Sequence, residues 1–350
     1  MPNQFLTLKD VTAWNGTDDA VGLVDNIVNV APELDRVLGR PIKGISYRAR
    51  ILTAYGSNAA FRAVGGGVAL SAPSFDRKRF NCFPFDCQFE VGEDLLIDRE
   101  EGETPAEIFE AHATAGVRQK ALRIGKQFYL GSANDPKGPP GLIDFLAIAR
   151  TQVDSRTGQK IDQAVDAGGN SSSCEIVWFI KQGPQGVHWM FGNGRGIVMN
   201  PWLRQRVASI DTLGTATPLY RTAWISNLFG YIGLSMANYH AVGAIINVDP
   251  SYTISAGTTT FAAGLNDQLI ADLWAKFPIT EKPDLAFATQ KAAASLQAAR
   301  TVTNFVNGTN RDFTKGIAPV ADFPTTLPTA GNIPLIVTDS IVPSTKITLS

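Results

Sequence analysis

Residues 104–131 read TPAEIFEAHATAGVRQKALRIGKQFYLG and carry the strongest local signal in the sequence. Thr104 places a hydroxyl at the N-cap, Pro105 suits the first helical position, and Glu107 completes a reciprocal capping box. Apolar residues then recur at close to the helical period until a glycine provides a stop. The sequence therefore predicts one helix over residues 105–130, roughly 38 Å long, which would span a whole domain.

Two stretches before this helix alternate apolar and polar residues, which predicts long strands. They cover residues 45–55 and 83–91, on either side of the glycines at 65–67. The simplest interpretation is one long β-hairpin over residues 45–92 that folds near its glycines.

The chain after the helix is rich in turns and short apolar runs. Gly and Pro crowd residues 131–141, and residues 175–255 read mostly as strands, with one brief helix over 201–207. This part of the chain is therefore expected to contribute most of the sheet.

Helices and strands alternate in the C-terminal third. Apolar spacing predicts helices over 265–277 and 289–300, with the short buried strand KPDLAF between them. Closing strands are expected over 333–337 and 341–349. The fold class is therefore α+β.

The composition is that of a globular chain with few surface charges. Of 350 residues, 44% are apolar and only 18% are charged, below the roughly 25% usual for soluble proteins. Lys and Arg number 31 against 32 Asp and Glu, a net charge of −1, which excludes a dedicated polycationic nucleic-acid binder. So few solvating charges indicate that partners cover much of the surface.

Signals for secretion, membrane insertion and disulfides are weak. Cys82, Cys87 and Cys174 are too few for a disulfide scaffold and lack the spacing of a zinc site. The N-terminal residues show no basic region followed by an apolar run, and no stretch reaches about 18 uninterrupted apolar residues. We therefore expect a chain of the reducing cytoplasm that does not span a membrane.

Signals for catalysis are equally weak. His112, His188 and His240 are the only near-neutral bases, and we expect each to be a packed or surface imidazole. The glycine-rich run at 192–196 lacks the helix and the acidic residue of a dinucleotide loop, so it is predicted to be a turn. No Walker loop or metal-ligand cluster occurs, and the sequence predicts no enzyme, no cofactor and no metal.

Charge is strongly segregated along the chain. Residues 40–79 hold eight bases and one acid, a balance of +7, whereas residues 86–110 hold one base and ten acids, a balance of −9. Opposite charges of this size would allow copies of the chain to bind one another. In the alternative interpretation the charges pair within the hairpin, where Arg48 would lie near Asp86, and the acids suit the dipole of the following helix.

A basic triplet, Arg77, Lys78 and Arg79, has no acid opposite it in that register, because residues 55–59 contain none. We therefore predict that the triplet contacts an acidic surface of a neighbouring copy. The best acidic candidates are Glu93, Asp94, Glu100, Glu101 and Glu103.

Short motifs along nearly the whole chain resemble a tailed-bacteriophage major capsid protein. They are VAPEL at 30–34, IKGISY at 42–47, GKQFYLG at 125–131, KGPPGLI at 137–143, GPQGVHW at 183–189, LWAKFP at 273–278, KPD at 282–284, LQAAR at 296–300 and IPLIVTD at 333–339. None of them is catalytic, but their order is specific. The fold of this family is typified by phage HK-ninety-seven, and the resemblance is closest to the epsilon-fifteen-like group.

The resemblance implies a division of the chain into the parts of that fold. These are an N-terminal arm over 1–44, an extended β-hairpin loop over 45–92, a mainly peripheral domain over 93–264 with inserted strands and the spine helix 105–130, and a mainly axial domain over 265–350.

The resemblance also implies a function without a chemical reaction. Such a protein self-assembles as hexamers and pentamers into an icosahedral shell that encloses double-stranded DNA, and it belongs to the virion after assembly in the host cytoplasm. Expected partners are a separate scaffolding protein or none, a portal, and a decoration or cement protein, with the DNA held without sequence-specific contacts. The alternatives are an encapsulin-like compartment that holds cargo enzyme and, more weakly, a hydrolytic enzyme that uses the acidic cluster.

Overall fold

The computed structural model describes most of the chain after residue 30. The described residues are 31–54, 61–62, 64–67, 72–98, 104–154, 157–194, 196–209, 219–255, 258–306, 329–330 and 333–348. Residues 1–30 of the expected N-terminal arm therefore lie outside the described part, whereas residues 31–44 belong to it.

The elements alternate along the chain as an α+β protein. The helices are α3 (Glu33–Arg36), α4 (Glu93–Ile97), α5 (Pro105–Leu130), α6 (Leu142–Arg150), α7 (Asp267–Lys276) and α8 (Gln290–Val306). The strands are β1 (Gly39–Pro41), β2 (Ser46–Ala54), β3 (Ser74–Asn81), β4 (Phe83–Gly92), β5 (Ala164–Asp166), β6 (Glu175–Ile180), β7 (Val187–Phe191), β8 (Val198–Met199), β9 (Leu203–Ser209), β10 (Leu219–Met236), β11 (Val242–Ser255), β12 (Thr258–Ala263), β13 (Leu285–Ala288), β14 (Thr329–Ala330) and β15 (Ile333–Val337).

Helix α5 has the predicted bounds and the predicted N-terminus. The Thr104 backbone N–H donates to Glu107 Oε2 over 2.8 Å, and the Glu107 N–H donates to Thr104 Oγ1, so both halves of the capping box form. At Gly116 a Cβ would collide with the ring of Phe89, and this glycine therefore allows α5 to lie directly on β4. The spine-like helix is confirmed.

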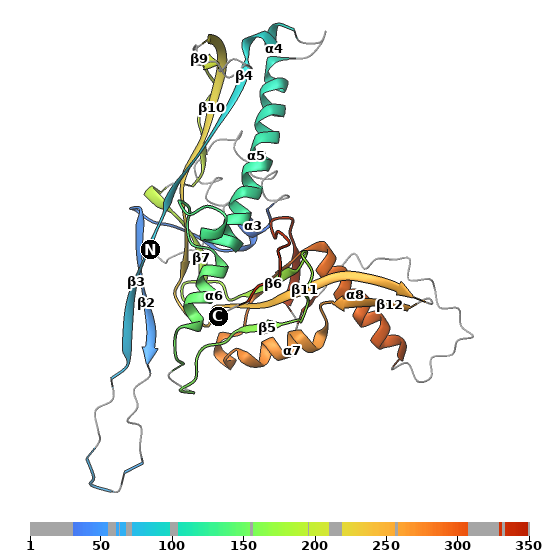
Figure 1. The fold of residues 1–350 in the computed structure, drawn as a ribbon. Helices are drawn as coiled ribbons and strands as arrows, with labels where there is room; N and C mark the ends of the chain where they lie inside the picture. Colours follow the sequence, from blue (N-terminus) through green and yellow to red (C-terminus); the bar gives the residue numbers. More distant parts are fainter. Residues whose placement is uncertain are drawn as a thin grey trace.

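The strands form three sheets, and Figure 1 shows how they extend the molecule in three directions. A six-stranded sheet of order β1-β7-β10-β4, with β8 and β9 also paired to β10, rises beside α5. A seven-stranded sheet of order β12-β11-β6-β13-β15-β14, with β5 on β11, forms a second body with α7 and α8. The two-stranded sheet β2-β3 projects away from both.

A shared core joins the two bodies. The rings of Phe128 on α5 and Trp189 on β7 lie 5.1 Å apart, and Phe128 also contacts Phe287 of the seven-stranded sheet. A second cluster, which includes Leu273 and Leu296, fills the space between that sheet and α7 and α8. The bodies are therefore packed together through the C-terminal end of α5.

The predicted pairing of the two strands in the 45–92 hairpin is wrong. β2 pairs antiparallel with β3, whereas every residue of β4 has a partner on β10, about 140 positions further along the chain. Alternation identifies the buried face of a strand but not its neighbour, and the apolar face of β4 is covered by α5. The hairpin therefore closes at Asn81 rather than at residue 92.

Three other predictions need correction. Most of the expected helix over 201–207 is instead part of strand β9, which pairs antiparallel with β10 in an unbroken register. The expected strand over 341–349 does not form within its described residues, where Ser344 makes only an isolated bridge to Cys174. The boundary expected at residue 264 does not separate two sheets, because the seven-stranded sheet joins strands from both sides of it. The helices over 265–277 and 289–300, the strand in KPDLAF and the strand over 333–337 are confirmed.

Candidate functional site

The β2-β3 hairpin places four arginines on one face. Arg48 lies opposite Arg79 and Arg50 lies opposite Arg77, and residues directly opposite in an antiparallel pair share a face. All four are exposed. We call these four residues the arginine face.

The arginine face lacks acidic partners within the subunit. No carboxylate of the described residues forms an ion pair with any of the four. Asp76 lies opposite Ile51 on the other face, where its Oδ1 accepts from the backbone N–H of Arg77. Like charges placed directly opposite destabilise a strand pair, so this hairpin favours contact with an anionic surface.

Lys78 does not belong to this surface. It lies opposite Ala49, and its Nζ is 4.7 Å from the centroid of the Tyr239 ring, a cation–π contact within the subunit. The predicted triplet is therefore divided, with Arg77 and Arg79 on the exposed face and Lys78 against the body.

The sequence analysis missed Arg48 and Arg50 as members of the same surface. Both pairs of arginines have a spacing of two, which places each pair on one face of its strand. A turn centred near residue 64 instead of 67 would have brought the two pairs together. The spacing of the arginines was visible in the sequence, but the wrong partner strand kept the two pairs apart in the predicted register.

The predicted acidic candidates fall into two groups. Glu93 and Asp94 begin α4, while Glu100, Glu101 and Glu103 lie outside the described residues. The carboxylate of Glu93 already accepts from Arg204 Nη2 over 2.6 Å within the same subunit. Asp94 is exposed and forms no ion pair with any described residue.

The two charged surfaces do not meet within one chain. In Figure 1 the β2-β3 hairpin projects from one end of the molecule, while α4 lies at the opposite end, beyond the tip of α5. Only contact between different copies of the chain can bring these surfaces together.

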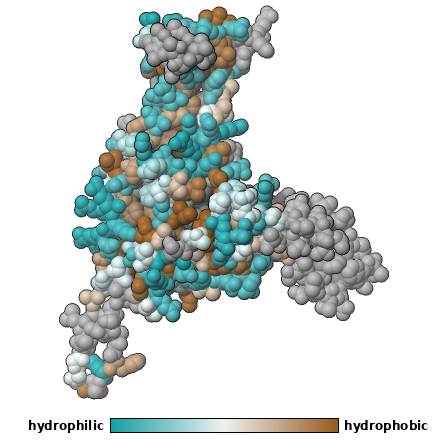
Figure 2. All heavy atoms as spheres, in the orientation of Figure 1, coloured by the Kyte–Doolittle hydropathy of each residue, from teal (hydrophilic) through white to brown (hydrophobic). Residues whose placement is uncertain are grey.

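Apolar side chains accompany both charged surfaces. On the hairpin Leu52 pairs with Phe75 on the arginine face, and the two side chains are 37% and 57% exposed. On α4, Leu95 and Ile97 are 46% and 77% exposed, and Figure 2 shows apolar surface at this tip. Each surface therefore combines charge with apolar area, as protein–protein interfaces commonly do.

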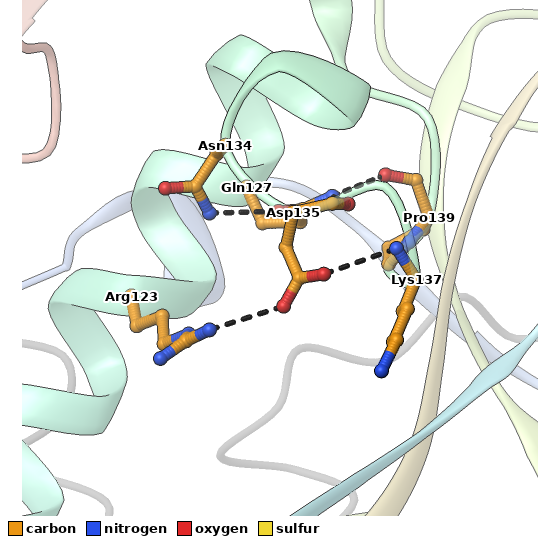
Figure 3. A network of polar contacts seen from close by, with 6 residues as sticks. All are labelled: Arg123, Gln127, Asn134, Asp135, Lys137 and Pro139. Carbon is orange, nitrogen blue, oxygen red and sulfur yellow. Dashed lines mark hydrogen bonds and ion pairs between the residues drawn. The ribbon is translucent and has the colours of Figure 1, made fainter.

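The turn region after α5 contains a network of polar contacts, which Figure 3 shows. Gln127 Nε2 donates to the carbonyl oxygens of Asp135 and Pro139 over 3.1 and 2.8 Å, and its Oε1 accepts from Asn134. The backbone N–H of Lys137 and the guanidinium of Arg123 hold the pKa of the Asp135 carboxyl below its usual range. These polar groups hold one another in place, which is a structural use of two of the family-like motifs.

The histidines form no catalytic set. His112 is exposed on α5, while His188 is fully buried on β7 with its Nδ1 3.1 Å from the carbonyl oxygen of Gly183. His240 Nε2 lies 3.6 Å from an Asp154 carboxylate oxygen, far along the chain from the other two. The described residues hold no group of three or more side chains that could bind a metal ion.

The cysteines and helices carry no further site. Cys82, Cys87 and Cys174 are free and buried, and burial raises the pKa of the Cys82 thiol to about 11. No helix in the described part is both long enough and apolar enough to cross a membrane.

Comparison with known proteins gives a family and a fold. A family model described as Major capsid protein GP7 matches residues 124–317, more than half of the chain. A chain in the structure of bacteriophage Epsilon15 is 14% identical, with a TM-score of 0.59 over 90% of this chain and 88% of that chain. This similarity shows a shared fold.

Two further structures are more distant. A chain of the procapsid of bacteriophage JBD30 is 10% identical, with a TM-score of 0.41 over 93% of this chain and 99% of that chain. A chain of the holo-SrpI encapsulin complex from Synechococcus elongatus PCC 7942 is 8% identical, with a TM-score of 0.37 over 61% of this chain and 85% of that chain. No curated protein sequence matches the chain.

Proposed function

Because the chain belongs to the major capsid protein GP7 family and so builds the capsid shell of a virion, we propose that it assembles as hexamers and pentamers into an icosahedral shell around double-stranded DNA. The observation that carries this proposal is the family match, together with a fold shared with a phage structure. We further propose that the shell forms in the host cytoplasm with a portal, with a decoration or cement protein, and with a separate scaffolding protein or none.

The parts of the fold have proposed places in the shell. We assign the six-stranded sheet with α5 to the peripheral domain and the seven-stranded sheet with α7 and α8 to the axial domain. The β2-β3 hairpin becomes the extended loop, and the residues before β1 become the N-terminal arm, because β1 itself belongs to the six-stranded sheet. In this assignment the axial domain gains strands β5, β6, β11 and β12, which the sequence analysis had placed before residue 264.

The proposed contact between subunits joins the arginine face to the acidic end of a neighbouring copy. Four exposed arginines that form no ion pair with any described residue, with Leu52 and Phe75 beside them, support the basic half of this contact. Asp94, with the exposed Leu95 and Ile97, supports the acidic half, to which Glu100, Glu101 and Glu103 are added from the sequence. Charge complementarity of this kind selects partner and register.

We propose that the protein catalyses no reaction. Of the acidic cluster that a hydrolase could use, the Glu93 carboxylate already forms an ion pair with Arg204. An encapsulin-like compartment would share the shell architecture but hold protein cargo, and the family match favours the capsid.

Electron microscopy of the purified protein tests the proposal directly. We expect closed shells with hexameric and pentameric capsomers, and nucleic acid in particles from infected cells. A protein that remains monomeric at all concentrations would overturn the proposal, and shells filled with an enzyme in place of DNA would favour the compartment.

DNA binding by isolated capsomers should be weak. With a net charge of −1 the shell should confine the genome without strong specific contacts. Affinity for DNA should therefore fall only shallowly with salt, because the slope scales with the number of phosphates neutralised. Retention on DNA at physiological salt with a slope of roughly −5 or steeper, measured by titration at several salt concentrations, would contradict this expectation.

A further inference from the structure

One carboxyl group is buried where three distant parts of the chain meet. Glu33 on α3 is fully buried, and its Oε2 accepts a hydrogen bond from Thr338 Oγ1 over 3.0 Å. Its backbone carbonyl oxygen accepts from Trp189 Nε1 over 3.1 Å. The residue therefore touches both the six-stranded sheet and the segment that follows β15 of the seven-stranded sheet.

Helix α5 closes the same site from a third side. A Cβ at Gly125 would collide with both Glu33 Oε1 and Ser340 Oγ, so glycine is needed for the carboxyl to fit here. Tyr129, one turn further along α5, is also buried, and burial together with the Glu33 carboxyl raises the pKa of its phenol. Hydroxyl groups of Thr338 and Ser340 surround the remaining space.

Among the described residues, the site contains no cation to balance a negative charge. The ionisable groups that act on Glu33 are the Tyr129 phenol on α5 and the exposed Asp339 carboxylate on the C-terminal segment, and no Lys or Arg of the described residues opposes them. Burial raises the pKa of the Glu33 carboxyl, Asp339 raises it further, and the neighbouring hydroxyl groups of Ser340 and Thr338 lower it in part. A buried charge without a partner is strongly unfavourable, so the neutral acid fits this site better.

We propose that the Glu33 carboxyl is a proton-controlled latch between the two bodies of the subunit. In the neutral form it holds residues 338–340 against α3 and α5. In the ionised form it weakens this contact, which frees residues 338–340 from α3 and α5. The latch concerns the single subunit and does not depend on the proposed interface between copies.

The sign of the pH effect follows from the direction of the pKa shift. Because the folded-state pKa of Glu33 is raised, its stabilising effect is complete below the unfolded value of about 4.5 and is lost as pH rises through the folded pKa. The isosteric substitution Glu33→Gln keeps a neutral polar group at all pH values and removes this dependence.

Hydrogen exchange at matched pH tests the latch on the full chain. The amide of Thr338 donates to the carbonyl oxygen of Ala288, and the amide of Ser340 donates to Thr338 Oγ1. At pH 4.5 we expect these amides to exchange equally in wild type and Glu33→Gln. At pH 8 they should exchange faster in wild type than in Glu33→Gln, because the buried carboxyl is then driven towards its unfavourable ionised form while glutamine stays neutral.

Asp339→Asn provides a matched control that keeps the carboxyl at residue 33. Removing the neighbouring charge should reduce the excess exchange at pH 8 in wild type and have no effect in the Glu33→Gln background. A wild-type to Glu33→Gln ratio that stays constant with pH would overturn the proposal. So would a Glu33→Gln protein that is already loosened or unfolded at pH 4.5, or an Asp339→Asn effect that is equal in both backgrounds.

Discussion

Subunits carrying Arg77→Glu and Arg79→Glu should need a concentration at least about tenfold higher to form shells, yet they should unfold at the same temperature as wild type. An exposed ion pair contributes roughly 0–1 kcal/mol, and two reversed pairs per contact are enough for a factor of about ten. Because the contact recurs at every subunit, a small change per copy moves the assembly threshold strongly. Light scattering against protein concentration measures the threshold, and circular dichroism measures the unfolding of the subunit.

The subunit should tolerate this reversal because of the observed register. The new carboxylates at positions 77 and 79 would face Arg50 and Arg48, which replaces two like-charge cross-strand pairs by opposite-charge pairs. The hairpin itself is therefore expected to gain slightly in stability. This separates an effect on assembly from an effect on folding.

Two further variants control the experiment. Asp94→Lys on α4 should restore part of the assembly of the double variant if the acidic end of the neighbouring copy is the partner. Lys78→Gln should have little effect on assembly, because Lys78 contacts Tyr239 within the subunit. Assembly of the arginine variant at the wild-type concentration over a range of salt would show that the arginine face is only solvated surface.

Elements with a complete local signal could be predicted from the sequence. The capping box at Thr104 and Glu107 defines the start of α5 through contacts between residues three apart, so the helix needs no distant information. Likewise the apolar spacing of α7 and the compact run of β13 appear where the sequence predicts them. Short-range chemistry determines such elements.

Strand pairings and other contacts between residues far apart in the sequence could not be predicted in this way. The alternation of β4 is correct, but its partner β10 is far away in sequence, and nothing in either strand identifies the other. The segment after Ile341 has the residues of a strand, yet Ile347 bonds through its backbone to the side chain of Asn247 instead of to a neighbouring strand. In both cases the available hydrogen-bonding partner, and not the β-propensity of the residues, determines which structure forms.

At the candidate site, too, local features could be predicted from the sequence and contacts with distant residues could not. The segregation of charge identified the basic surface, but only the β2-β3 register brought Arg48 and Arg50 into it and turned Lys78 away. The buried Glu33 gave no signal in the sequence, because its environment is made by segments about 90 and 300 positions away. The chemical role of a residue whose neighbours come from distant parts of the chain can be recognised only in the structure.

His188 should make the folded subunit sensitive to acid. Burial is the main reason that the pKa of this imidazole falls from 6.5 to about 4, and the Arg40 guanidinium, whose Nη1 donates to Tyr47 Oη beside the His188 ring, contributes to the same shift. The folded state thus prefers the neutral ring, while the unfolded state takes up a proton below pH 6.5. Stability is therefore complete above pH 6.5 and is lost as pH falls towards 4.

The expected loss is large enough to measure by denaturant unfolding. A shift of this size corresponds to about 3 kcal/mol between pH 7 and pH 4, which is a substantial part of the stability of a domain. In His188→Gln the replacement cannot take up a proton, so the free energy of unfolding should fall by about 3 kcal/mol less over the same range. His112→Gln is the matched control, because His112 lies exposed on α5 and is not desolvated by folding. Equal acid dependence in wild type and His188→Gln would show that the β7 imidazole is already protonated in the fold, or that another group governs acid unfolding. Glu33 acts with the opposite sign, since its contribution to the stability of the fold decreases as pH rises.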